Sequence, residues 1–174
     1  MFHVKHPVIA ERVEHTLKPI YDKRSRVLVL GTMPSPASRE VGFYYGHPQN
    51  RFWKVLAALF GETVPESNEE RTALLLAHHL ALWDVLASCT IEGASDASIS
   101  DPASNDLGII LNAAPIKLVA TTGLKAAALY RRFNGPLAEG LPHIALPSTS
   151  PANARMSLED LVAAYQPLKD ALGH

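Results

Sequence analysis

The sequence predicts an α/β fold, a three-layer α/β/α sandwich around a four-stranded parallel sheet. Four short aliphatic runs, of the kind that form strands buried on both faces, alternate along the chain with segments of helical periodicity. The expected strands are residues 26–30, 80–86, 116–120 and 144–146. Strands that alternate with helices in this way predict a parallel sheet covered by helices on both faces.

Caps and breakers mark the helices between these strands. The helix after Asn50 carries apolar residues at helical spacing and ends at Gly61. The last helix begins at Ser157, with Asp160 three residues on as in a capping box, and Pro167 should kink it. The expected helices are residues 10–17, 52–60, 67–78, 106–113, 124–133 and 157–172, and residues 90–105 are expected to form a long surface loop.

Length and composition indicate one globular domain. The chain has 174 residues, 47% of them hydrophobic, and residues 1–20 are expected to form a leader segment ahead of the fold. The longest apolar runs are far shorter than the ~20 residues of a membrane helix, and the first residues lack the apolar core of a signal peptide. We therefore expect a cytoplasmic monomer with no membrane partner.

The net charge and the potential metal-ligating residues further limit the functional classes to which the protein can belong. A net charge of −1 argues against a strongly basic nucleic-acid binder, so any DNA binding must use a local patch and should be salt-sensitive. The single cysteine, Cys89, excludes an internal disulfide and any cysteine-only metal site. Among the eight histidines, only His78 and His79 are adjacent, and on a helix they point about 100° apart. No metal and no cofactor is expected.

The loop after the first strand, residues 31–50, has the composition of a binding site for a planar ligand. Prolines fix its backbone, its glycines allow close approach to the main chain, and three aromatic residues offer flat faces. The aromatic residues are Phe43, Tyr44 and Tyr45. The alternative is a rigid turn whose aromatic side chains complete the core.

A second loop, residues 147–156, should open at the same edge of the sheet, because the carboxyl ends of parallel strands meet there. We expect the active cleft between the two loops. Asp84, near the end of the second strand, needs partners for an ionised carboxylate, and these are either a ligand or loop amides. Asn50 likewise has two interpretations, a functional side chain or the N-cap of the following helix.

Taken together, the two loops resemble the uracil-DNA glycosylase superfamily. The run from Tyr45 to Leu56 is similar to the segment after motif one of mismatch-specific uracil-DNA glycosylases, and residues 146–153 with 157–159 resemble their second motif and closing helix. The resemblance is closer to the hypoxanthine-DNA (deoxyinosine) glycosylase branch and runs from about residue 20 to the C-terminus. It rests on the following segments: Gly31-Thr32-Met33-Pro34, Tyr44-Tyr45, the run from Leu82 to Cys89, and Ser148-Thr149-Ser150-Pro151-Ala152-Asn153.

The resemblance implies a role for each matching residue. Met33 stands where uracil-specific relatives have a catalytic Asn or Asp, and a thioether cannot orient water by strong hydrogen bonds. In the deoxyinosine branch the catalytic side chain is implied to be Asn50, with Tyr45 as the aromatic on which the flipped base stacks. The remaining substrate-binding residues expected are Met33, Pro34, Ser35, Asp84, Ser150 and Asn153, and the expected DNA contacts are Ala152 and Arg155.

The implied function is a monofunctional DNA repair glycosylase that flips a deaminated base out of double-stranded DNA and hydrolyses its N-glycosidic bond. Hypoxanthine is the expected base, released by water without strand cleavage. Two alternatives remain open, a mismatch-type uracil or thymine glycosylase on the same scaffold and a non-catalytic nucleotide-binding module. The second alternative predicts a phosphate-binding loop, for which residues 31–35 lack the necessary glycines and lysine.

Overall fold

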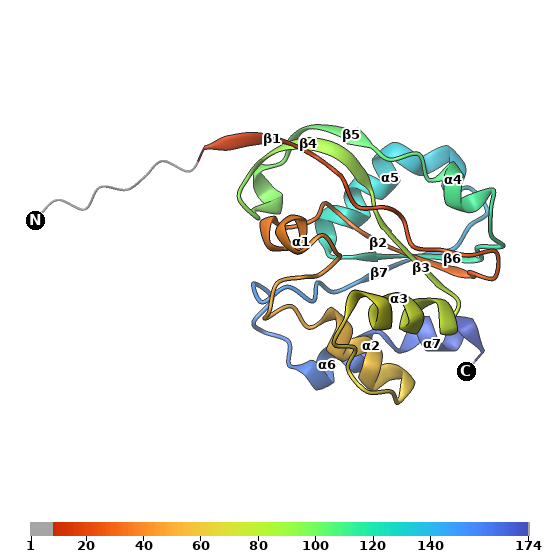
Figure 1. Ribbon diagram of the computed structural model, residues 1–174. Helices are drawn as coiled ribbons and strands as arrows, with labels where there is room; N and C mark the ends of the chain where they lie inside the picture. The colour runs from red at the N-terminus through yellow and green to blue at the C-terminus, as the bar shows by residue number, and fades with distance from the viewer. Residues whose placement is uncertain (1–8, 174) are drawn as a thin grey trace, which may run out of the picture.

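The computed structural model describes residues 9–173, and its centre is a four-stranded parallel sheet (Figure 1). The strands lie in the order β3-β2-β6-β7. Their bounds are β2 (Val27–Gly31), β3 (Leu80–Asp84), β6 (Leu118–Thr122) and β7 (His143–Leu146). Every residue of β2, β3 and β6 is buried, as expected for strands covered on both faces. The predicted α/β/α sandwich with a four-stranded parallel sheet is therefore confirmed.

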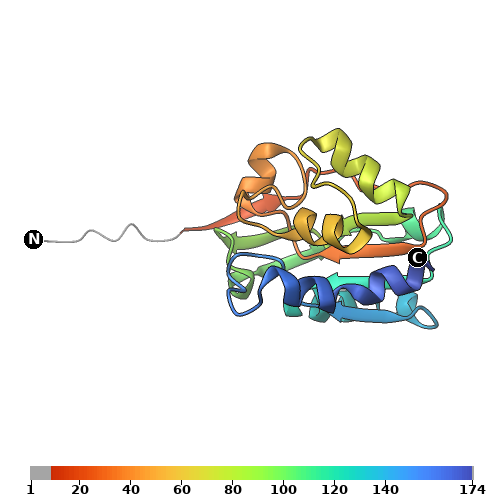
Figure 2. The same cartoon turned by 90° about the horizontal axis from the view of Figure 1, so that it is seen from below.

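Helices cover both faces of this sheet. Figure 2 shows α2 side by side with the blue helices α6 and α7 on one face, and Figure 1 shows α5 on the other. The bounds are α2 (Phe52–Phe60), α3 (Asn68–Ala77), α4 (Gly108–Leu111), α5 (Leu124–Ala138), α6 (Leu158–Ala164) and α7 (Gln166–Leu172). The described helices include none long and apolar enough to cross a membrane.

The helix boundaries follow the expected caps with two changes. The last helix divides at Tyr165 into α6 and α7, so the interruption expected from Pro167 lies two residues before it and Pro167 itself is in the first turn of α7. The capping box between Ser157 and Asp160 is complete. α5 is longer than expected and kinks at Asn134, whose φ of −123° is not helical. The expected helix 106–113 is reduced to the single turn of α4.

The structure contains a second, antiparallel sheet that the sequence analysis did not predict, and three expectations about its segments are wrong. Its order is β1-β4-β5, with β1 (Ala10–Glu14), β4 (Leu86–Glu92) and β5 (Ser100–Ser104). The expected strand 80–86 ends at Asp84, and after Val85 the chain passes into the second sheet. Residues 90–105 are therefore not a surface loop, because β4, the short 3₁₀ helix η1 (Asp96–Ser98) and β5 occupy most of them.

The expected helix over residues 10–17 is also wrong. Ala10–Glu14 pairs antiparallel with β4, from Glu14 opposite Ser88 to Ala10 opposite Glu92, and only Val13 of this strand is buried. An exposed edge strand of this kind is held by pairing with a distant segment rather than by its own periodicity. Residues 1–8 of the expected leader segment lie outside the described residues.

The first loop contains a short helix that the sequence interpretation did not include, α1 (Pro36–Val41). The Ser35 hydroxyl caps it by accepting the Ser38 N–H, and it ends at Gly42, whose φ of 78° suits glycine. Buried Ser38 then accepts the Gly46 N–H at 2.9 Å, which closes the loop back on this helix. α1 therefore fixes the turn that carries Tyr44 and Tyr45.

Candidate active site

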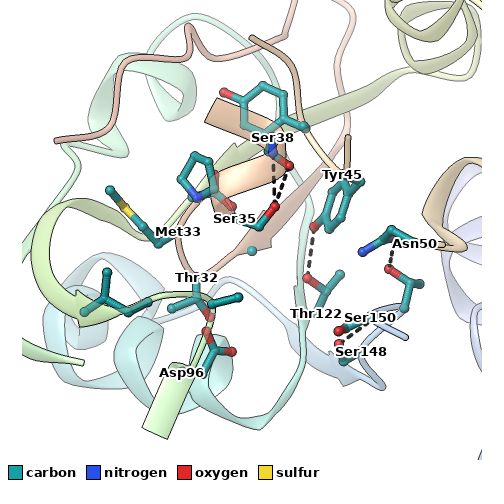
Figure 3. A pocket seen from close by; sticks show the side chains of 17 residues that line it. Thr32, Met33, Ser35, Ser38, Tyr45, Asn50, Asp96, Thr122, Ser148 and Ser150 are labelled. Carbon is teal, nitrogen blue, oxygen red and sulfur yellow. Dashed lines mark hydrogen bonds between the residues drawn. The ribbon is translucent and has the colours of Figure 1, made fainter. Parts of the chain in front are cut away.

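A cavity of about 140 Å³ opens at the carboxyl ends of β2, β3 and β6 (Figure 3). This is close to the ~150 Å³ of a cavity that accommodates one benzene ring. The two loops of the sequence analysis meet there, residues 31–50 on one side and residues 148–150 on the other. The lining is Gly31, Thr32, Met33, Pro34, Ser35, Ser38, Tyr44, Tyr45, Asn50, Asp84, Ile91, Ala94, Asp96, Thr122, Ser148, Thr149 and Ser150.

Asn50 joins the two loops and also faces the cavity. Its Oδ1 accepts the Phe52 N–H and the Thr149 hydroxyl, both at 2.9 Å. Because a backbone N–H can only donate, this bond fixes which end of the amide is oxygen. The nitrogen is directed toward the side of the cavity where Tyr45 lies (Figure 3). Asn50 thus accepts the N–H of the first residue of α2 and presents an N–H donor to the cavity, whereas the N-cap position itself is occupied by Arg51 and not by Asn50.

Arg51, the next residue, holds the second loop in place. Its backbone N–H donates to the Thr149 carbonyl at 3.1 Å, and its guanidinium donates to the carbonyls of Asn153 at 2.9 Å, Ser150 at 3.4 Å and Met156. The planar guanidinium suits several carbonyls at once. The sequence analysis assigned no role to Arg51. The only feature of the sequence that could have indicated one is its position next to Asn50.

Tyr45 forms one wall of the cavity. Its ring stacks on Phe52 with centroids 3.9 Å apart and planes at 18°, and its hydroxyl lies 3.0 Å from Thr122 Oγ1. Because Phe52 covers one face of the ring, only the opposite face is left for a ligand. Burial, followed by the charge of Asp84, raises the pKa of Tyr45 well above its ordinary value of 10.0. The phenol therefore stays protonated at neutral pH.

Thr122 was not among the expected substrate-binding residues. It is the last residue of β6, at the edge where β2 and β3 also end, and its hydroxyl lies 3.5 Å from the Leu30 carbonyl. A polar residue placed directly after an aliphatic strand is a signal from which its position could have been inferred.

Asp84 lines the cavity and is 4% exposed. Its Oδ2 is 2.9 Å from Nε2 of His15, and the two side chains are 6% and 2% exposed. The partner that its burial requires is therefore a histidine from the segment after β1, rather than loop amides. Nothing in the sequence indicated that these two residues, which are 69 positions apart, would be in contact.

The other expected residues of the first loop all line the cavity, but they differ in which of their polar groups already have a hydrogen-bond partner. Met33 and Pro34 both line the cavity. The Ser35 hydroxyl is occupied, since it caps α1 and lies 3.1 Å from Ser38 Oγ. Among residues 9–173, no acceptor for the Met33 N–H or the Ser35 N–H is found, which leaves both amides able to bind a ligand.

The expected residues of the second loop divide into two groups. Ser150 lines the cavity, together with Ser148 and Thr149. Asn153 does not line it, because its side chain donates to the Ser148 carbonyl at 2.9 Å and supports the loop from within. Ala152 and Arg155 are exposed beyond the cavity.

The second sheet supplies a wall that the sequence analysis did not foresee. Ile91 and Ala94 reach the cavity from the end of β4 and the turn after it, and Asp96 comes from η1. Desolvation raises the pKa of Asp96 above its ordinary value, against the opposing effect of Lys125. In the part of the chain that the structure describes, no group of three or more His, Cys, Asp or Glu could hold a metal ion.

Fold and cavity together define a class, α/β proteins with a cavity where the strands of a parallel sheet end, which is the usual ligand site of such sheets. The family model described as "Uracil DNA glycosylase superfamily" matches residues 19–169. The chain therefore belongs to the uracil-DNA glycosylase superfamily, and it is a DNA glycosylase that acts on DNA.

Two curated relatives and one solved structure refine this placement. A "Hypoxanthine DNA glycosylase" from Methanosarcina barkeri is 36% identical over 110 residues, which cover 62% of this chain and 70% of the relative. Another of the same name, from Methanosarcina acetivorans, is 32% identical over 140 residues, covering 79% of this chain and 87% of the relative. A solution NMR structure of a candidate uracil DNA glycosylase from M. acetivorans is 28% identical, with a TM-score of 0.75 over 90% of this chain and 98% of the other.

Proposed function

We propose that this protein is a monofunctional glycosylase that releases hypoxanthine from deoxyinosine in double-stranded DNA, acting as a monomer in the cytoplasm. The observation that carries the proposal is the Asn50 amide. Its oxygen is held by Phe52 at the start of α2 and by Thr149 of the second loop, and its nitrogen is directed into the cavity. The names of the two curated relatives support hypoxanthine as the base.

The first step of the proposed reaction is extrusion of the base. Unstacking costs a few kcal/mol, and stacking on the free face of Tyr45 returns ~1–3 kcal/mol. The two nearly balance, so bases already weakly paired are favoured. Hypoxanthine opposite thymine is such a base.

The second step is cleavage of the glycosidic bond by water. Asn50 Nδ2 would hold the water by its oxygen, while the Met33 and Ser35 amides stabilise the negative charge that develops on the departing purine. One such donor contributes ~2.7–4 kcal/mol in comparable sites. Since an amide is a poor base, we expect a slow reaction that depends mainly on leaving-group stabilisation.

The proposal includes no strand cleavage. Cleavage by a glycosylase requires an amine nucleophile, and the cavity lining formed by residues 9–173 contains no lysine. Ala152 and Arg155 are proposed to contact the DNA beside the extruded base, from the exposed part of the second loop, with Asn153 supporting them. Met33 in the cavity lining disfavours the mismatch-type uracil or thymine alternative.

The test is an excision assay on labelled duplexes that contain inosine, uracil or xanthine. We expect alkali-labile abasic sites from inosine, no break without alkali, and no covalent complex on borohydride treatment. Faster release of uracil than of hypoxanthine would favour the mismatch-type alternative. Absence of abasic sites from all three duplexes would favour a non-catalytic module.

A further inference from the structure

We propose that His15 and Asp84 form a pair that reads the ring N–H of a deaminated base, with His15 fixing one carboxylate oxygen so that the other accepts that N–H. This inference rests on the proposed function and names the feature of the substrate that the cavity selects. His15 acts here as a positioning residue, because it contacts Asp84 and does not line the cavity.

The first step is the geometry of the carboxylate. Oδ2 is bound to His15 Nε2 at 2.9 Å, and Oδ1 accepts no hydrogen bond from any of residues 9–173. Oδ1 lies directly over Gly31, where an added Cβ would stand 2.4 Å from it and 3.1 Å from the Tyr45 hydroxyl. Gly31 is therefore needed for this close approach, and the free oxygen lies where the cavity lining meets Tyr45.

The second step is how firmly His15 is placed. Its backbone N–H donates to the Ala87 carbonyl at 2.7 Å, which ties it to the start of β4. Its ring lies beside Tyr44 and Trp83, with centroids 6.1 Å and 6.3 Å away. Because a carboxylate only accepts, Nε2 carries the shared hydrogen. A buried carboxylate that lost this donor would keep an unsatisfied oxygen.

The third step is the chemistry of deamination. In adenine, N1 is a bare acceptor, and in hypoxanthine it becomes an N–H donor beside a carbonyl. Cytosine N3 changes in the same way when uracil forms. A carboxylate accepts that new N–H and repels the lone pair of the parent base. Sites built to bind a substrate N–H reject analogues that lack it, so this pair would separate deaminated adenine and cytosine from their parents.

The experiment compares single-turnover release of hypoxanthine with release of unsubstituted purine, which lacks the N–H, from matched duplexes. In Asp84→Asn the remaining oxygen still faces His15, so an amide donor replaces the acceptor toward the base. We expect the rate ratio of hypoxanthine to purine to fall by about ten- to a hundredfold. His15→Ala should slow hypoxanthine release by a similar factor, and His15→Gln, which can still donate, should restore most of it.

His143→Gln is the matched control. His143 is a half-buried histidine whose Nε2 lies 2.8 Å from Thr121 Oγ1, and it lies outside the cavity lining. Both rates should be unchanged in this variant. If His15→Ala and Asp84→Asn lower the melting temperature and leave the ratio as in the wild type, the pair is structural and the inference is overturned. Wild-type protein that releases neither base would overturn the proposed function together with the inference.

Discussion

Replacing Asn50 by alanine should separate its structural role from its catalytic one. The change removes the Oδ1 acceptor of the Phe52 N–H and of the Thr149 hydroxyl, as well as the N–H donor directed into the cavity. Loss of a side-chain acceptor for an N–H group at a helix start costs ~0.5–2 kcal/mol. For a domain of this size each kcal/mol lowers the melting temperature by ~2–4 °C. The variant should therefore remain folded at 25 °C.

The effect on the reaction should be much larger. Loss of one preorganised donor in such a site typically lowers kcat by ~10²–10³. The assay is single-turnover release of hypoxanthine from a labelled duplex, with melting measured on the same preparation. Thr149→Val is the matched control, because it removes the same bridge between the loops and keeps the Asn50 amide. Asn50→Ala protein that releases hypoxanthine within threefold of the Thr149→Val rate would refute a catalytic role for Asn50.

Three further perturbations address the ring, the loop and the last helix. Tyr45→Ala should weaken binding of an inosine duplex by the equivalent of ~1–3 kcal/mol, measured by fluorescence anisotropy, and a variant that unfolds instead would make Tyr45 a core residue. Arg51→Lys should weaken DNA binding, since a compact ammonium lacks the planar fork with which the guanidinium spans the three carbonyls of the second loop; an unchanged dissociation constant would contradict this. Hydrogen bonds from Ser157 hold the pKa of Asp160 below its ordinary value of 3.8, so its stabilising effect is present above pH 3.8 and is lost as the pH falls through the lower folded-state pKa. Asp160→Asn should accordingly lower the melting temperature at pH 7, and the difference from wild type should shrink in acid; a difference that does not change with pH would count against the capping box.

The parallel sheet was predictable because its strands carry their own signal. β2, β3 and β6 are short aliphatic runs buried along their whole length, and the turns around them are marked by glycine and proline. The helices were predictable for a similar reason, since Ser157 and Asp160 form a local cap that requires no distant partner.

The second sheet could not be predicted in this way. β1 has the sequence Ala-Glu-Arg-Val-Glu with one buried residue, and β5 is Ser-Asp-Pro-Ala-Ser, polar and mostly exposed. Neither has the alternation of a half-buried strand. Both are held by pairing with β4, which brings together segments far apart in the chain. Propensity within a short window contains no information about such a partner.

The same distinction, between local sequence signals and contacts with distant segments, applies to the residues of the candidate site. The sequence placed Asn50, Tyr45 and Asp84 because each lies in or beside a segment with a recognisable motif, and all three line the cavity. It missed His15, which approaches Asp84 only because β1 pairs with β4. It also placed Asn153 among the substrate-binding residues, whereas the fold turns that side chain back onto the Ser148 carbonyl. Motifs thus indicated which loops matter, and the tertiary fold decided which side chains face the ligand.

The central claim is that an extruded base enters the cavity between residues 31–50 and residues 147–156. A crystal structure of the Asn50→Ala variant bound to a duplex containing deoxyinosine tests it most directly, because the slowed reaction should trap the intact substrate. The account predicts hypoxanthine outside the helix, against the free face of Tyr45 with its N1–H toward Asp84. A base that remains stacked in the duplex, or that lies on any other face of the protein, would contradict it.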